Sequence, residues 1–312
     1  MGSALTLLFV VCFNFFLFRI VPSDPLAHML RGRNISREVQ DNLRAAFGLD
    51  QPITTQFVYY LRETFRGNLG ISFHSRQPVW DEIVERIPAT VELLGVSWLF
   101  AAVIGTAGGV IAGWRRNTWK DRLITSSTMT LYSVPDFWLG IILLTVFSVV
   151  LGWFPIGGMQ SVGVRLQGFE AFLDHLRHLF LPALTLSLAY MGEYTMVTRS
   201  SLVEVMSEDY LTVARAKGLR DKVVRNHHAL PNALLPVVTL AALNLGFILS
   251  GAIAVESVFS WPGLGQATAE AIRGPDYPML QGLFLLFSAS VILFNLIADL
   301  LYMYLDPRVE AS

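Results

Sequence analysis

The sequence contains six long apolar stretches, which constrain its possible folds more than any other feature. They cover approximately residues 2–21, 89–113, 121–151, 180–203, 233–256 and 279–305. A helix needs about 20 largely apolar residues to cross roughly 30 Å of hydrocarbon. Apolar residues make up 53% of the chain and charged residues 15%, against roughly 25% charged residues in a soluble domain. The sequence therefore predicts an all-α polytopic membrane protein with six transmembrane helices.

Two of these stretches need a closer interpretation. The stretch 121–151 is too long for one straight crossing and contains Pro135, which lacks the backbone N–H of a continuous helix. We expect either one kinked, tilted helix or two half-helices joined at the proline. The stretch 2–21 has no basic start and no small-residue cleavage pattern. We therefore interpret it as a span and not as a removable signal sequence.

The distribution of lysine and arginine predicts the orientation of the chain. All three lysines and many arginines fall in the segments 114–122 and 199–232, and basic residues concentrate in cytoplasmic loops. The connections 152–179 and 257–278 carry few basic residues, as outside loops should. The segment 22–87 holds eight arginines, but it exceeds the roughly 60 residues over which the rule applies. We therefore expect this segment outside and both termini in the cytoplasm.

Charge and composition exclude several kinds of site. A net charge of −1 gives no basic field of the kind that nucleic-acid-binding proteins use. Cys12 is the single cysteine, so neither an intramolecular disulfide nor a zinc site of several thiolates can form. His175 and His178 are one helical turn apart without an evident third ligand, and His227 and His228 point to different faces of a helix. We therefore expect no metal site.

The sequence also lacks the motifs of common hydrolase sites. It contains no Gly-x-x-x-x-Gly-Lys-Ser/Thr phosphate loop, no Gly-x-Ser-x-Gly elbow and no His-Glu-x-x-His pair. We therefore expect no catalytic residues in this chain and no ATP hydrolysis by it.

One face of the stretch 89–113 is lined with small residues. Ala101, Gly105, Gly109 and Gly113 recur every four residues, so they lie along one side of a helix. Small side chains let another helix approach closely. The neighbour can be a helix of the same chain or of a second membrane subunit, and the sequence leaves both interpretations open.

The segment 203–232 is predicted to form a helix-turn-helix at the membrane face. Its composition favours helix except at Gly218, and a glycine can end one helix in a left-handed conformation and let the next begin at an angle. Alanines alternate with Arg215 and Lys217 before this glycine. Such basic residues commonly lie beside anionic lipid headgroups, and the alternative is contact with a specific partner.

The same segment resembles a known family motif. The run 209–219, followed by Ala-Leu-Pro at 229–231, resembles the cytoplasmic loop of permease subunits of binding-protein-dependent ABC importers. In that family Glu-Ala-Ala, three residues and Gly are followed by nine residues and Ile-x-Leu-Pro. Gly218 and Pro231 match this spacing. Three positions depart from the pattern: Thr212, Val213 and His228.

Further segments resemble the oligopeptide, dipeptide and nickel branch, so the resemblance covers nearly the whole chain. Besides Ala-Arg-Ala-Lys-Gly at 214–218, they are 19–25, 67–72, 256–265, 276–278 and 305–308. The resemblance implies the type I ABC importer permease fold and a place in the bacterial plasma (inner) membrane. It divides the chain into a first helix (1–21), an extracytoplasmic region (22–87), a five-helix core (88–308) and a tail (309–312).

The resemblance also implies a function and a set of partners. The chain would form half of a translocation path for di- or oligopeptides, paired with a second, homologous permease subunit as a heterodimer. Two cytoplasmic ATPase subunits would bind ATP and Mg²⁺, so this chain would hold no cofactor, and an extracytoplasmic solute-binding protein would deliver the substrate. Nickel or another small solute is the alternative within the family. A proton-coupled secondary transporter that uses Asp136 and Glu193 as a relay is the alternative outside it.

Candidate functional residues follow from the resemblance and from polarity. By analogy the segment around Gly218 contacts an ATPase as a coupling helix, through Asp209, Tyr210, Ala214, Arg215, Ala216, Lys217, Gly218, Leu219, Leu230 and Pro231. A charge at the centre of a span costs about 2.5–3.5 kcal/mol, so it persists only with a partner or beside a wet cavity. Polar residues expected to line the path, or else to bond a neighbouring helix, are Asp136, Glu193, Asn244 and Glu256.

The outer segments carry the remaining predictions. Trp261, Pro262 and Gly263 are expected to form an outer gate, with the tryptophan at the membrane interface and a short helix after it over 266–272. Within 22–87 we expect helices over 41–46 and 56–65. This region is either a surface cap or a dock for the binding protein.

Overall fold

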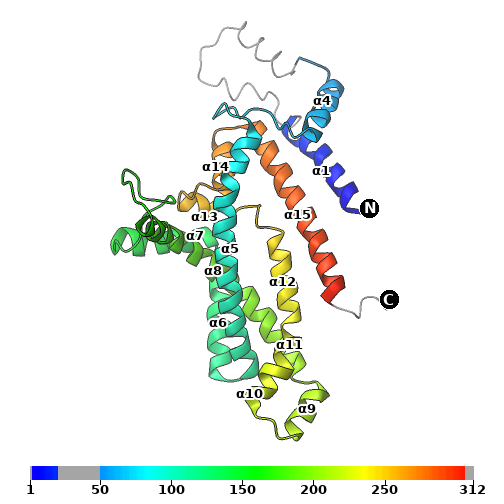
Figure 1. Cartoon of the computed structure of the whole chain (residues 1–312), viewed down its shortest axis with the longest axis vertical. Coiled ribbons are helices and arrows are strands. Elements are labelled where there is room, and N and C mark those ends of the chain that lie inside the picture. The colour runs from blue at the N-terminus through cyan, green and yellow to red at the C-terminus, as the bar shows by residue number, and fades with distance from the viewer. Residues whose placement is uncertain (1, 20–49, 306–312) are drawn as a thin grey trace.

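The computed structural model describes residues 2–19 and 50–305, with described side chains at 5–18 and 50–297. These residues are mostly helical (Figure 1). Within them, β-pairing is limited to one antiparallel bridge between Ile71 and Pro78. Because the described elements are helices, the predicted all-α class is confirmed. The backbone groups within a helix bond one another, as a hydrocarbon environment requires. The expected helix over 41–46 and the tail 309–312 lie outside the described residues.

The described helices follow one another along the chain, and the longest described connection between them is 151–168. The order is α1 (Gly2–Arg19), α4 (Ile53–Phe65), α5 (Val79–Trp114), α6 (Trp119–Ser133), α7 (Asp136–Leu143), the π-helix η1 (Leu144–Val150), α8 (Phe169–Val205), α9 (Asp209–Ala216), α10 (Asp221–Val223), the π-helix η2 (Val224–Ala229), α11 (Leu230–Ala233), α12 (Leu235–Leu245), α13 (Ile253–Val258), α14 (Leu264–Arg273) and α15 (Tyr277–Leu305). The helices expected over 56–65 and 266–272 are confirmed as α4 and α14.

α5 runs along the long axis of the molecule, from the level of α14 to that of α9–α11 (Figure 1). It begins at Val79, before the predicted start at residue 89. Pro78 precedes it, and Asp81 and Glu82 in its first turn suit the positive end of the helix dipole. Pro88 lies inside α5 without ending it. The predicted outside region 22–87 therefore ends in helix.

α8 packs along α5 through the strip of small residues. These two helices share the most extensive helix–helix contact among the described elements. A Cβ added at Gly105 would lie 2.5 Å from the Met191 carbonyl oxygen, and one added at Gly109 would lie 2.5 Å from the Thr198 Cβ. Only hydrogen fits at these positions, so the interpretation of the strip as packing within one chain is confirmed.

Each predicted span except the second half of 233–256 falls on helix in the described residues, although not each forms one straight rod. By length and composition α5 and Tyr277–Ile297 of α15 can cross a membrane, and two bent pairs raise the number among the described helices to at most four. These pairs are Trp119–Ser133 with Asp136–Val150, bent by 98°, and Asp221–Ala233 with Leu235–Leu245, bent by 43°. The predicted span 180–203 lies within α8. In α1 (Gly2–Arg19), the described side chains of Leu5–Phe18 form an apolar helix.

The break at Pro135 overturns the expectation of one kinked helix over 121–151 and confirms its alternative, two half-helices. Val134 takes an extended conformation because the proline ring disfavours helix at the residue before it. The prediction of one helix over 233–256 is wrong in its second half. α12 ends at Leu245, and the chain turns through Gly251, with φ of +70°, before α13 begins. That conformation favours glycine over any residue with a Cβ.

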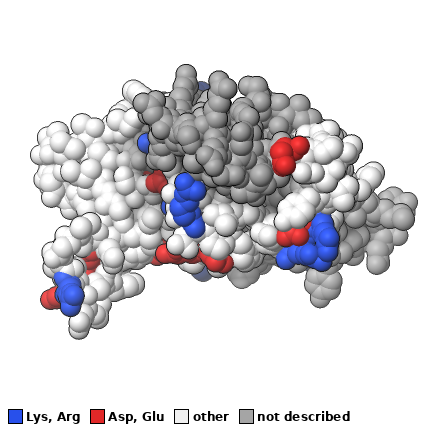
Figure 2. All heavy atoms as spheres, turned by 90° about the horizontal axis from the view of Figure 1, so that it is seen from above, with Lys and Arg blue, Asp and Glu red and all other residues white. Residues whose placement is uncertain are grey.

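The segments beside the start of α5 form a compact cap. Apolar side chains from α5, α14 and α15 pack together there: Val79, Ile83, Leu264, Ala267, Ala271, Met279 and Leu283. Asp276 is buried and accepts hydrogen bonds from the Ser72 hydroxyl (2.6 Å), the His74 N–H (3.0 Å) and the Met279 N–H (3.1 Å). It thereby caps α15 and ties the loop before α5 to it. Seen from this end, the described surface carries scattered charges of both signs (Figure 2).

Candidate functional site: the coupling hairpin and the bundle interior

The predicted helix-turn-helix is present at the end of the molecule opposite α4 (Figure 1). α9 ends at Ala216, and Gly218 follows with φ of +77°, in the left-handed region that favours glycine. The Gly218 N–H donates a hydrogen bond of 2.9 Å to the Arg215 carbonyl and closes the turn. α10, η2 and α11 then lead back to α12. We call the segment 209–233 the coupling hairpin.

One face of the coupling hairpin is buried against the ends of α5 and α8. Its contacts form an apolar cluster of Leu202, Leu211, Ala214, Val224, Ala229 and Ala233. Trp114, at the end of α5, donates a hydrogen bond of 2.8 Å from Nε1 to Asp221 Oδ2. The Arg215 guanidinium lies 5.9 Å from the centre of the Trp114 ring, within the range of a cation–π contact. The hairpin is therefore attached to the rod formed by α5.

The other face of the coupling hairpin is exposed. Tyr210, Val213 and Leu219 present apolar surface there, although the segment is rich in charged residues. Six of the predicted coupling residues are also exposed: Asp209, Arg215, Ala216, Lys217, Gly218 and Pro231. Leu230 is half-buried, and Ala214 belongs to the buried face. Apolar side chains among basic ones on an exposed helix form a surface that suits another protein.

Three of the four predicted pathway residues converge on one turn of α8. Asp136 begins α7, which packs against α8, and Glu193 lies on α8 between Tyr190 and Tyr194. Asn244 on α12 donates a hydrogen bond of 2.9 Å to the Tyr194 hydroxyl. Asp136, Glu193 and Asn244 are all half-buried. The structure thus gathers carboxylates, an amide and tyrosines from three helices in the interior of the bundle.

The fourth predicted pathway residue, Glu256, lies elsewhere, between α13 and the start of α14. Its side chain has 0% exposure and is bonded by protein groups. Trp261 is also fully buried, and its Nε1 donates a hydrogen bond of 2.8 Å to the Ala89 carbonyl. The expectation that Trp261 lies at the membrane interface is therefore wrong, because its polar atom is satisfied inside the protein. The gate role of residues 261–263 stays a prediction.

The histidines form local hydrogen bonds. His175 contacts Glu92 Oε1 through Nε2 at 2.6 Å and the Met159 carbonyl through Nδ1 at 3.1 Å. His178 Nδ1 bonds the Asp174 carbonyl one turn earlier. Among the described residues, no three His, Cys, Asp or Glu side chains gather as a metal ion would need. His175 thus joins α8, α5 and the loop 151–168.

An ion pair that was not predicted from the sequence joins α6 to α8. Arg199 donates to both carboxylate oxygens of Asp121, at 2.6 and 2.8 Å, and Asp121 is 3% exposed. We counted Arg199 only toward the charge of a cytoplasmic loop. The available signal was the acidic residue in the first turn of α6, which stood alone among basic neighbours.

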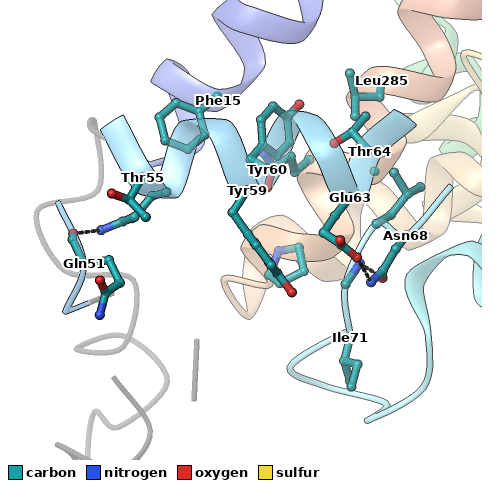
Figure 3. Close-up of a pocket in the computed structure, with 16 residues that line it drawn as sticks. Phe15, Gln51, Thr55, Tyr59, Tyr60, Glu63, Thr64, Asn68, Ile71 and Leu285 are labelled. Carbon is teal, nitrogen blue, oxygen red and sulfur yellow. Dashed lines mark hydrogen bonds between the residues drawn. The ribbon is translucent and has the colours of Figure 1, made fainter. Parts of the chain in front are cut away.

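A cavity of about 680 Å³ lies between α1, α4 and the start of α15 (Figure 3). Its lining is rich in aromatic rings and amides, including Phe15, Tyr59, Tyr60, Gln51, Gln56 and Gln281. Glu63 also lines it and accepts a hydrogen bond of 2.8 Å from Asn68. None of the predicted pathway residues lines this cavity. It is therefore separate from the polar cluster around Tyr190 and Tyr194.

Comparisons with known proteins agree with this architecture. Residues 105–311 match the family "Binding-protein-dependent transport system inner membrane component", and residues 1–94 match its N-terminal membrane-component family. The glutathione transport system permease protein GsiC of Escherichia coli strain K12 is 41% identical over 304 residues, covering 97% of this chain and 94% of that protein. The di/tripeptide transport system permease protein DppB of Pseudomonas aeruginosa is 38% identical over 315 residues, covering 96% and 94%.

A solved structure gives the corresponding likeness in three dimensions. It shows an inward-facing conformation of the MetNI methionine ABC transporter, with a TM-score of 0.58 and 19% identity. The match covers 72% of this chain and 96% of that chain, which establishes the shared fold. The chain therefore belongs to the family of binding-protein-dependent transport system inner membrane components, and it has the type I ABC importer permease fold.

Proposed function

We propose that this chain is the permease subunit that forms half of the translocation path of an ATP-driven importer for small peptides. Its similarity over nearly its whole length to a glutathione permease and a di/tripeptide permease supports a peptide substrate. The exposed face of the coupling hairpin supports the permease role within an ATP-driven complex. The same family membership does not favour the proton-coupled alternative, and the peptide relatives do not favour nickel.

The coupling hairpin is the part that receives the motion of an ATPase. Tyr210, Val213 and Leu219 offer apolar contact, and Arg215 and Lys217 offer charge to an acidic partner surface. The ATPase subunits supply ATP and Mg²⁺ binding, and this chain supplies no nucleotide chemistry. The hairpin transmits motion because its buried face is packed on α5 and α8. We assign the hairpin and both termini to the cytoplasmic side of the inner membrane, because the basic residues concentrate in the segments 114–122 and 199–232.

The path itself passes the polar cluster on α8. Asp136, Glu193 and Asn244 come from three helices and retain partly exposed polar groups beside tyrosines. Carboxylates can bind the amino group of a peptide, and the amide and hydroxyls can bond its carbonyls and N–H groups. A second permease subunit completes the path from the other side, and a solute-binding protein delivers the peptide. Glu256, enclosed by protein, is not placed on the path.

The proposal is tested at Gly218. Replacing it by valine (Gly218→Val) forces a β-branched residue to φ of +77°, at a cost of roughly 1–2 kcal/mol, although the added Cβ would touch nothing. We expect ATP-dependent peptide uptake by proteoliposomes to fall while the complex still inserts and co-purifies. Unchanged uptake would reject the hairpin as the coupling element.

A matched control variant exists in the same chain. Gly67 has φ of +80° and also has nothing within 4 Å of an added Cβ, so Gly67→Val carries the same local strain outside the hairpin. We expect G67V to retain uptake.

Tritiated glutathione and tritiated Ala-Ala, each with unlabelled peptide or Ni²⁺ as competitor, distinguish the substrate classes. Uptake that is blocked by Ni²⁺ but not by peptides would refute the peptide assignment.

A further inference from the structure

The start of α14 is held by side chains from two other segments. The first three N–H groups of a helix have no partner within it. In α14 the Leu264 N–H donates to Thr90 Oγ1 (2.7 Å), and the Gln266 N–H donates to Glu256 Oε2 (3.0 Å). Thr90 belongs to α5 and Glu256 to α13, so three segments meet at this one helix end.

The two side chains also bond each other. The Thr90 hydroxyl donates to Glu256 Oε1 at 3.1 Å, and the Ala252 N–H donates to the same oxygen at 3.2 Å. Both side chains have 0% exposure. The positive end of the α14 dipole and its N–H groups stabilise the buried carboxylate. The Glu256 carboxylate thus supplies the negative charge at the N-terminus of α14.

The backbone around the carboxylate leaves no room for larger residues. A Cβ added at Gly263 would collide with Thr90 Oγ1 and the Glu256 carboxylate, and one added at Gly265 would lie 2.9 Å from the Glu256 carboxyl carbon. Trp261 closes the arrangement by donating to the Ala89 carbonyl on α5. We call Thr90, Glu256, Trp261 and the N–H groups of Leu264 and Gln266 the clamp.

We propose that the clamp fixes α13 and α14 to α5 throughout the transport cycle, with Glu256 as its positioning residue. α5 continues without a proline from Thr90 to Trp114, about 36 Å at roughly 1.5 Å per residue. Trp114 holds the coupling hairpin at the far end of this rod. The clamp therefore makes the segment 253–273 move with the hairpin as one body. This inference rests on the proposed coupling role of the hairpin.

The test is the accessibility of a thiol placed under α14. Ala267 is 2% exposed and packs in the cap against α5. Ala267→Cys, in a Cys12→Ala background, is treated with a maleimide in the assembled complex, without nucleotide and with ADP and vanadate. The proposal expects protection in both states. Labelling that appears on vanadate trapping would show that the contact opens during the cycle and would overturn it.

Substitutions in the clamp provide a second test, measured by the same maleimide labelling and by peptide uptake. Thr90→Val keeps the shape but removes the hydroxyl, and Glu256→Gln turns one acceptor into a donor that faces the Gln266 N–H. We expect labelling to rise and uptake to fall roughly tenfold or more, because buried polar groups lose their partners. Thr90→Ser retains the hydroxyl and is expected to stay protected and active. Ser257→Ala, beside the clamp but bonded only within α13, is the control.

Further measurements distinguish loss of the clamp from partial unfolding of the protein. They also distinguish failure of the clamp proposal from failure of the proposed function. We expect Thr90→Val to retain basal ATP hydrolysis while losing its stimulation by the binding protein, a ratio that partial unfolding would not change. Equal protection and uptake in T90V and T90S would overturn the clamp. If no ATPase subunit co-purifies, the proposed function fails, whereas T90V against T90S in the nucleotide-free state still decides whether the clamp holds α14.

Discussion

The two ends of α5 hold their neighbouring segments by different means. At the hairpin end, Trp114 bonds the exposed carboxylate of Asp221. At the clamp end, the Thr90 hydroxyl bonds the Glu256 carboxylate and the Ala89 carbonyl bonds Trp261 Nε1. Neither Glu256 nor Trp261 has exposed surface. A segment that another protein must grip keeps its polar groups in water, whereas a contact that must stay closed is built from buried, paired groups. Similar substitutions at the two ends should therefore have unequal effects.

The largest effect is expected from Trp261→Ala. Removing this fully buried ring leaves a cavity in the core around Leu93 and Leu186 and removes the hydrogen bond from the ring to the Ala89 carbonyl. We expect a loss of about 3–5 kcal/mol of stability, measured as the thermal unfolding of the detergent-solubilised complex. Trp119→Ala, at a ring that is 68% exposed, is the control and should change little. A small effect of W261A would remove the distinction between the two ends.

The second-largest effect is expected in α5, the helix that joins the hairpin end to the clamp end. Gly109→Ala places a Cβ 2.6 Å from the Thr195 carbonyl and 2.5 Å from the Thr198 Cβ. We expect α8 to be pushed from α5, at a cost of roughly 1–3 kcal/mol and with reduced uptake. Gly95, on the same helix, has nothing within 4 Å, so Gly95→Ala should stabilise by about 0.4–1 kcal/mol through the unfolded state. Equal unfolding temperatures of the two variants would contradict this packing.

Local features of the fold could be predicted from the sequence. The apolar stretches, the break at Pro135 and the turn at Gly218 each depend on a few neighbouring residues. The strip of small residues on α5 predicted close packing, although not its partner. The early end of α12 was missed, because residues 246–252 are as apolar as the helix before them and turn at Gly251. Composition alone does not distinguish such a turn from a continuing span.

Long-range contacts decided where prediction of the site failed. Glu256 was expected on the path because a carboxylate in an apolar stretch needs a partner or water. One of its actual partners is Thr90, which lies 166 positions away in the sequence and could not be identified from it. Trp261 was placed at the membrane interface from the general preference of tryptophan, but its partner is a backbone carbonyl of α5. The coupling hairpin was found because its family motif is contiguous.

A smaller effect is expected at the hairpin end. Trp114→Phe removes the Nε1–H donor to Asp221, an exposed partner that water can replace, so we expect a stability loss of only about 0.5–1.5 kcal/mol. Retention of the ATPase subunits after detergent washing should fall more than thermal stability does, because the hairpin is loosened. Asp221→Asn keeps an acceptor oxygen and should behave like the parent. A loss as large as that of W261A would make the two ends equivalent.

The smallest effect concerns the loop 151–168, which lies beside the clamp end but is held by partly exposed groups. Asp174 accepts hydrogen bonds from the Ser161 hydroxyl (2.7 Å) and N–H (2.8 Å), and these bonds lower the pKa of its carboxyl below the ordinary value of 3.8. His178 and Arg177 also favour its charged form. Because the folded pKa is the lower one, the contact stabilises the loop at neutral pH and is lost as pH falls below 3.8.

Hydrogen exchange of the Ser161 N–H measures this loss. Its protection relative to an unstructured peptide should stay constant from neutral pH to about pH 4 and decline below that, because the carboxylate that accepts its hydrogen bond becomes protonated. Asp174→Asn mimics the protonated state and should show the low protection at every pH, whereas Ser161→Ala keeps the N–H and should show an intermediate value. Protection that does not change with pH would mean that the loop, like the clamp, is held by buried contacts rather than by Asp174.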